Sequence, residues 1–195
     1  YICQDFIHVE HVEPKSLGYD KETDWNNFLV SCPRCNGKDN KSNIHVSPSE
    51  MHLPHLNNTF LSFTYKTGGL IEVNQHLNGL AFVRAERIYR LTGLGKRPGE
   101  ADFKNGDVRW KKRKEAWKLA QRYKTRYQEG TISEEDICTL AVLRGFWSIW
   151  FTVFTGYPQV KQLLINSFSG TSSECFDPQN NYNPINRNIG MNDPT

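Results

Sequence analysis

The chain has 195 residues, of which 37% are apolar and 12% are aromatic. It can therefore bury a hydrophobic core, which excludes a wholly disordered protein, and its length suits one substantial domain or two small ones. The net charge is only +3, yet nine Lys and Arg residues and a single acid lie within 109–126. The rest of the chain is net acidic, so this segment predicts a polyanionic or acidic partner, or alternatively a well-solvated helix face.

The two ends of the chain and its most apolar stretch bear on location. The sequence opens in the middle of a pattern at Tyr1-Ile2-Cys3, so we expect the natural protein to have residues before it. No signal peptide is recognisable. The apolar stretch 137–154 contains Arg144 and Gly145 and barely reaches the minimum length of a membrane span. We therefore interpret it as a buried or interface helix and expect no membrane association.

Residues 1–58 are rich in His, Asn, Pro and Cys and show little hydrophobic periodicity. They include the CxxC motif Cys32-Pro33-Arg34-Cys35. Because nothing in the sequence indicates secretion, this motif predicts metal binding or redox chemistry rather than a structural disulfide. The segment as a whole predicts a small, loop-rich domain stapled by a metal.

The next elements are predicted from hydrophobic period and turn residues. Strands over 59–65 and 70–73, joined by a turn at Thr67-Gly68-Gly69, are expected to form a hairpin. A helix over 77–92 is expected to end at Gly93, because glycine favours the left-handed conformation that closes helices.

The second half of the chain is predicted to be mainly helical up to residue 168. A long helix is expected over 108–128, and Ser133 with Asp136 predicts a capping box that begins a helix over 134–154. Pro158 is expected to begin a shorter helix that ends near Ser167. The Asn-rich tail is expected to be irregular, and either disordered or an arm on a partner. The predicted divisions of the chain are 1–58, 59–168 and 169–195.

Four polar residues within 10–36 form a chemically coherent set. Glu10 and Asn36 offer oxygen donors suited to Mg²⁺ or Mn²⁺. His11 can accept a proton near neutral pH, as a general base must. Asn27 can hold a loop, or fix the orientation of the imidazole, by hydrogen bonding. Together these residue types predict metal-assisted hydrolysis.

The string EHVEPKS…DWNN…CPRCN within residues 8–43 resembles the motif of the HNH endonucleases, which fold as a ββα-metal unit. The resemblance implies that His11 activates the water that attacks a phosphodiester. It also implies that Glu10 and Asn36 hold one divalent ion, and that Asn27 stabilises the loop and the base. The third motif residue is Asn rather than His, which is a variant of the motif.

The cysteines extend this resemblance to a second metal. Many HNH proteins carry two CxxC pairs whose thiolates bind a structural zinc. Cys32 and Cys35 match the second pair, and Cys3 is a candidate for the one member of the first pair that this sequence contains. The resemblance therefore implies Mg²⁺ or Mn²⁺ for catalysis and a structural Zn²⁺.

The predicted helix 108–128 has two distinct faces. One arc is apolar and is expected to pack; it carries Ala116, Trp117, Leu119, Ala120, Tyr123 and Tyr127. The other, here called the cationic ridge, carries Lys111, Lys114, Lys118, Arg122 and Arg126. Such a ridge can follow a phosphate backbone or dock on an acidic protein surface. The next helix, with Trp147 and Trp150, is apolar nearly all round, as expected of a core or interface helix.

Parts of the C-terminal half are similar to HNH proteins of bacterial anti-phage systems, of the Septu type and associated with retrons. These parts are 76–93, 146–150 and 168–176. Such proteins are encoded beside an ABC/AAA-like ATPase. The similarity implies a bacterial, cytoplasmic effector nuclease docked on an ATPase, with DNA as the expected substrate and RNA as an open possibility.

The sequence thus predicts an α+β protein with an N-terminal ββα-metal unit, a β-hairpin and a mainly α-helical C-terminal region. The predicted activity is metal-dependent hydrolysis of nucleic acid. One alternative is a zinc ribbon that binds nucleic acid or protein without cutting; Glu10 and His11 argue against it, because a binder needs no base beside a metal. The other is a free-standing restriction-type HNH nuclease, against which stands the lack of a recognisable DNA-reading module.

Overall fold

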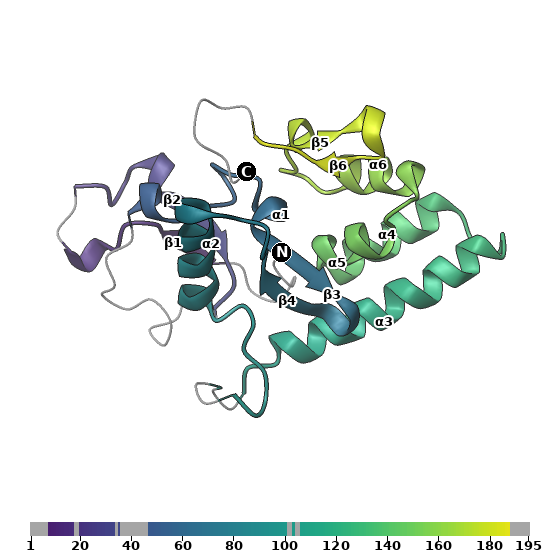
Figure 1. Cartoon of the computed structure of the whole chain (residues 1–195), viewed down its shortest axis with the longest axis horizontal. Coiled ribbons are helices and arrows are strands. Elements are labelled where there is room, and N and C mark those ends of the chain that lie inside the picture. Colours follow the sequence, from purple (N-terminus) through teal and green to yellow (C-terminus); the bar gives the residue numbers. More distant parts are fainter. Residues whose placement is uncertain are drawn as a thin grey trace.

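The structure is a computed structural model and describes residues 8–17, 20–33, 35, 47–100, 103 and 106–187. It confirms an α+β architecture, with helices and two-stranded antiparallel sheets (Figure 1). The strands are β1 (His8–His11), β2 (Phe28–Ser31), β3 (Phe63–Lys66), β4 (Leu70–Val73), β5 (Phe176–Asp177) and β6 (Asn183–Pro184). The helices are α1 (Thr59–Ser62), α2 (Gly79–Thr92), α3 (Arg109–Gln128), α4 (Glu134–Arg144), α5 (Trp147–Val153) and α6 (Pro158–Ser167).

Helix α2 carries the N-terminal hairpin, in which β1 pairs with β2 (Figure 1). Val12 is buried in a small core with two residues that follow the CxxC region, Met51 and Leu53. Leu29 from β2 and Ile88 from α2 pack against this core. The hairpin is thereby fixed to α2 by apolar contacts, and the ββα arrangement stays a prediction because most of the segment after Cys35 lies outside the described residues.

The second hairpin is confirmed, because β3 and β4 pair in antiparallel register. Its predicted first strand over 59–65 is wrong at its start, where residues 59–62 form helix α1. The reason is Asn58, whose side-chain oxygen accepts a hydrogen bond from the N–H of Phe60 at 3.1 Å. The amide of Asn58 also donates to the carbonyls of Cys175 and Ile185, both at 2.8 Å. The cap is therefore held by a distant part of the chain.

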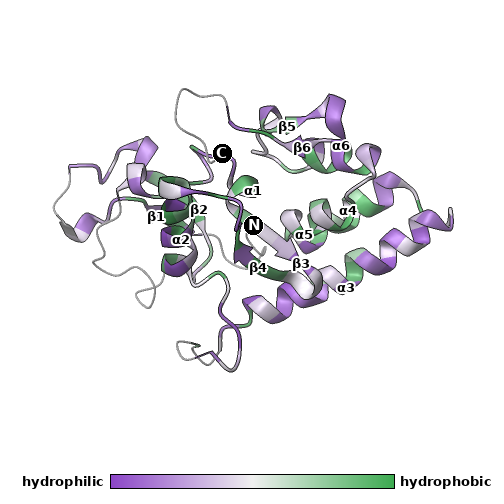
Figure 2. Ribbon diagram, in the orientation of Figure 1, coloured by the Kyte–Doolittle hydropathy of each residue, from purple (hydrophilic) through white to green (hydrophobic). Residues whose placement is uncertain are grey.

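Helices α2 and α3 lie close to their predicted positions. Gly93 closes α2 in the left-handed conformation, with φ of 58°. In α3 the residues Ala116, Trp117 and Ala120 are buried, as the apolar arc predicts. Hydrophilic residues run along much of the rest of this helix (Figure 2).

The predicted single helix over 134–154 is wrong, because the chain breaks it into α4 and α5. Its start is confirmed, since Ser133 and Asp136 form the predicted capping box. The break lies at Gly145 and Phe146, which both have positive φ, 70° and 59°. It turns α5 so that Trp150 is fully buried and donates from Nε1 to the carbonyl of Gly145 at 3.1 Å.

The tail predicted to be irregular is structured as far as residue 187 within the described part of the chain. Strands β5 and β6 pair with each other. Phe176 is buried, and its ring lies 4.8 Å from Phe151 and 5.5 Å from Trp147 between ring centroids. The tail covers the aromatic side of α5, and burial of these rings is the reason that it is ordered.

The main core is formed by α3–α6 together with this tail. Trp147 and Trp150 both lie in it, so of the two roles expected for the apolar helix the structure shows packing within the chain. Among the described residues, no helix is long and apolar enough to cross a membrane.

Gly69 sets how closely the β3–β4 turn approaches α3. An added Cβ at Gly69 would lie 2.7 Å from the backbone carbonyl group of Arg113, and φ at Gly69 is +73°. The neighbouring Gly68 also has a positive φ of +78°, but an added Cβ there would meet nothing within 4 Å. The two glycines therefore share the conformational requirement and differ only in the contact.

We predict that Gly68→Ala costs about 1 kcal/mol of unfolding free energy, from backbone strain alone. Gly69→Ala should cost about 3 kcal/mol, because overpacking against the α3 backbone adds to the same strain. Urea denaturation of both variants and the wild type checks this. Equal losses in the two variants would contradict the close approach as the reason for Gly69.

Candidate active site

The predicted catalytic pair lies at the end of β1. In the register of the hairpin, Glu10 pairs with Leu29 and His11 pairs with Phe28. Successive side chains of a strand point to opposite faces, so Glu10 shares a face with the core residue Leu29. His11 lies on the other face, which also carries the exposed Val9. The structure therefore does not bring the side chains of Glu10 and His11 onto one face of the hairpin.

His11 is half-buried, and contacts with Glu22 and Phe28 orient its ring. Its Nε2 atom lies 3.0 Å from the carbonyl oxygen of Glu22. Its ring meets the ring of Phe28 edge-on, with 4.9 Å between centroids. Because a carbonyl can only accept, Nε2 carries the proton in this hydrogen bond, and the basic lone pair of the neutral ring is on Nδ1. This orientation suits a general base.

Asn27 closes the loop that connects the two strands. It is 4% exposed, and its Oδ1 atom accepts from the N–H of Glu13 at 2.7 Å. Its Nδ2 atom donates to the carbonyls of Glu13 and Lys21, both at 3.1 Å. Its own carbonyl accepts from the N–H of Val12 at 2.9 Å. These bonds hold both ends of the loop that presents the carbonyl bound by His11.

The CxxC motif forms a tight turn in which the N–H of Cys35 donates to the carbonyl of Cys32 at 3.0 Å. Both thiols are free of disulfides. The hydrogen bond with Cys32, together with burial, raises the pKa of the Cys35 thiol. Arg109, in the first turn of α3, donates from Nη1 to the Cys35 sulfur at 3.2 Å. Since zinc binds thiolates, metal binding at this pair would release protons.

The described residues supply only part of each predicted metal site. Cys3 and Asn36 lie outside the described residues. Within the described ranges, no three His, Cys, Asp or Glu side chains are grouped to hold a metal ion. The thiols of Cys32 and Cys35 fit half of a tetrahedral zinc site, and the carboxylate of Glu10 is the type of ligand that Mg²⁺ prefers.

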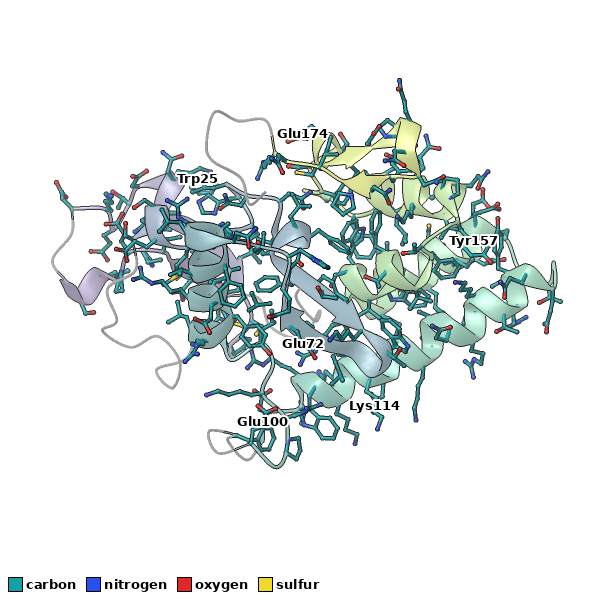
Figure 3. The ribbon with its side chains drawn as sticks, viewed as in Figure 1. Trp25, Glu72, Glu100, Lys114, Tyr157 and Glu174 are labelled. Atoms are coloured by element: carbon teal, nitrogen blue, oxygen red, sulfur yellow. The ribbon has the colours of Figure 1, made fainter. Side chains whose placement is uncertain are left out.

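The cationic ridge is solvent-exposed along its whole length on α3. Two of its members flank one aromatic ring: the guanidinium carbons of Arg122 and Arg126 lie 5.7 Å and 5.6 Å from the centroid of Tyr123. Lys114 projects away from the body of the protein (Figure 3). The ridge is therefore available to a partner.

Sequence reasoning missed two arginines and one tryptophan. Arg109 and Arg113 belong to the basic segment 109–126, yet Arg113 is buried and most of the Arg109 side chain is buried as well. Helical spacing gives a signal for Arg113, because it lies four residues before Trp117 on the packing side. Trp25 is 83% exposed and stacks edge-on to Phe28 at 5.7 Å (Figure 3). It lies on the side of the hairpin that carries His11.

Comparison with known proteins shows that the N-terminal part of the chain matches a protein-family model. Residues 2–42 match the family model described as HNH endonuclease. No curated protein matches the chain. HNH endonucleases generally use divalent metal ions. Residues 2–42, which include Glu10, His11, Asn27 and Asn36, are thus similar to an HNH endonuclease domain, and this similarity indicates nuclease activity on nucleic acid.

Proposed function

We propose that this protein is a metal-dependent endonuclease that hydrolyses phosphodiester bonds, with DNA as its main substrate. The observation that carries the proposal is the orientation of His11, whose Nε2 donates to the carbonyl of Glu22 within a loop closed by Asn27. This hydrogen bond fixes the tautomer and the ring orientation of a half-buried histidine. A base that must act at one defined nitrogen requires both.

In the proposed reaction, Nδ1 of His11 takes a proton from a water molecule. The water oxygen forms a bond to phosphorus as one ester P–O bond breaks, and the leaving alkoxide takes up a proton from solvent. The Glu22 carbonyl stabilises the protonated imidazole, because it accepts from the opposite ring nitrogen. Asn27 acts as a positioning residue, since it holds both Glu13 and Lys21 and touches no reacting atom.

Glu10 and Asn36 are the proposed ligands of Mg²⁺ or Mn²⁺, because the motif has metal ligands at these positions. Since Glu10 and His11 leave opposite faces of β1, the scissile phosphate would have to lie across the end of that strand to meet both side chains. When bound, such an ion supplies charge stabilisation at the scissile phosphate. Cys32 and Cys35, with Cys3, are proposed to hold a structural zinc. The turn at Cys35 and the Arg109 donor then fix the thiol pair against α3.

His11→Ala should lower the rate of plasmid cleavage by about 100- to 10,000-fold, the usual contribution of a general base. Its thermal unfolding and DNA binding should stay close to those of the wild type. His76→Ala is a matched control, because it makes the same change at an exposed histidine that lies outside the predicted motif. A folded His11→Ala protein that cuts at the wild-type rate would overturn the proposed base.

Removal of divalent ions by EDTA should abolish cleavage, and added Mg²⁺ or Mn²⁺ should restore it, because a site with two protein ligands exchanges its ion readily. Asn36→Ala should raise the metal concentration needed for half-maximal cleavage. Asn166→Ala, at an exposed position on α6, is the control. Cleavage in EDTA would refute the metal mechanism, whereas an unchanged metal requirement in Asn36→Ala would reject that ligand alone.

We also propose that the protein works as the effector of an ATPase-controlled anti-phage system, because its C-terminal half resembles such proteins. Here the cationic ridge has two candidate partners, the phosphates of nucleic acid and an acidic face of the ATPase. We assign it to nucleic acid, since its five exposed cations follow one another at intervals of three or four residues along α3, as contacts to successive phosphates require.

Changing all five ridge residues to Gln should weaken binding to duplex DNA. The log–log dependence of affinity on salt should also flatten, by about 0.9 for each phosphate contact that is lost. Filter binding at several salt concentrations measures both effects. If the same variant instead loses an ATPase that copurifies with the wild type, while its DNA binding and salt slope are unchanged, the ridge is a protein-docking surface and the assignment is wrong.

A further inference from the structure

A recess lies between the β3–β4 turn and the first turns of α3, away from the hairpin that carries His11. Its volume is about 300 Å³, which is at the lower end of the range for small-molecule sites. Its lining residues are Thr67, Gly68, Gly69, Leu70, Ile71, Gly95, Arg97, Trp110, Arg113 and Lys114. This set contains three cations, one indole and no carboxylate.

Arg113 is the most informative of these residues, because within the described part of the chain its buried side chain hydrogen-bonds to backbone carbonyls and not to an acid. Arg113 is only 6% exposed. Nε donates to the carbonyl of Gly69 at 3.2 Å, and Nη2 donates to the carbonyl of Leu94 at 2.9 Å. Two of its five N–H donors are used in these bonds. Burial, and then the charge of Arg109, lower the pKa of Arg113 to about 10, so it remains cationic at neutral pH.

The other walls supply further charge and an apolar surface. Lys114 is exposed beside Arg113 on α3, and Arg97 reaches the recess from the loop after α2. Arg97 is paired with Glu100 at 3.1 Å, at the surface. Trp110 lies one helical turn before Lys114 and is half-buried, and its indole is the one aromatic ring in the described lining. Gly68 leaves open space beside the turn, which allows a ligand to approach the backbone.

We propose that this recess binds a nucleoside phosphate. In this assignment the three cations hold the phosphate, because guanidinium and ammonium groups are its usual partners in proteins. Trp110 offers its ring to the base, since aromatic rings stack on any nucleobase. The nucleoside phosphate is either a free mononucleotide or a terminal nucleotide of a strand that follows the neighbouring cationic ridge. The site uses neither His11 nor the cysteines, so it does not rest on the proposed nuclease activity.

The test is isothermal calorimetry with the full chain in EDTA, with AMP, adenosine and inorganic phosphate as separate probes. A short single-stranded DNA is then added to the series, with and without a 5′-phosphate. The proposal expects AMP or the 5′-phosphorylated DNA to bind at least about tenfold more tightly than adenosine and phosphate, since stacking and charge both contribute. Tighter binding of AMP than of the 5′-phosphorylated DNA identifies the free nucleotide as the source, and the reverse order identifies the strand end.

Variants of the lining decide whether binding is at this recess. The double variant Arg97→Gln/Lys114→Gln should lower the affinity for the probe by about tenfold or more, as expected when charge-assisted hydrogen bonds are lost. Trp110→Leu should remove the advantage of the nucleotide over inorganic phosphate. The matched control is Arg90→Gln/Arg144→Gln, which removes the same charge from exposed positions outside both the recess and the cationic ridge.

Three outcomes would overturn the proposal. One is that neither AMP nor 5′-phosphorylated DNA binds. Another is that the lining variant and its control lose affinity equally, which would indicate general attraction to a basic surface. The last is that phosphate binds as tightly as AMP and Trp110→Leu has no effect, which would leave an anion site without a nucleoside. Thermal unfolding of each variant shows that it is folded.

Discussion

Two guanidinium groups at the start of α3 connect the parts of this protein. Arg109 donates to the Cys35 sulfur, to the carbonyls of Thr92 and Gly93 at the end of α2, and to Asp107. Arg113, one turn later, donates to Gly69 in the β3–β4 turn and to Leu94. Buried carbonyls need donors, and a planar guanidinium serves several of them at once. The CxxC turn, α2 and the second hairpin are therefore all positioned by the first turns of one helix.

This arrangement separates two kinds of chemistry along the chain. The hairpin with His11 depends on α2 for its position and on Asn27 for its loop, and both supports are local to the N-terminal half. The cationic ridge and the recess depend on α3, which packs against α5 and the β3–β4 turn. Arg109 is the direct link between them, because it touches the cysteine pair and begins the helix that carries the cations.

Local sequence signals predicted several features because they depend on residues close together in the chain. Gly93 closes α2, Ser133 and Asp136 form a capping box, and the apolar arc of α3 packs into the main core. The wrong predictions lie where distant residues decide. Asn58 caps α1 because the tail offers it two carbonyls, and α5 leaves the line of α4 so that its tryptophans enter the core.

The sequence by itself determined the candidate chemistry, since the types and order of Glu10, His11, Asn27 and Asn36 are sufficient to indicate an HNH-like motif. It also determined that α3 is amphipathic. The tertiary structure alone decided which ring nitrogen of His11 is basic, because the carbonyl of Glu22 lies eleven residues away. It likewise decided that Arg113 is buried beside a recess. Local patterns record the preference of each residue, whereas burial and hydrogen-bond partners depend on segments that meet only when the chain folds.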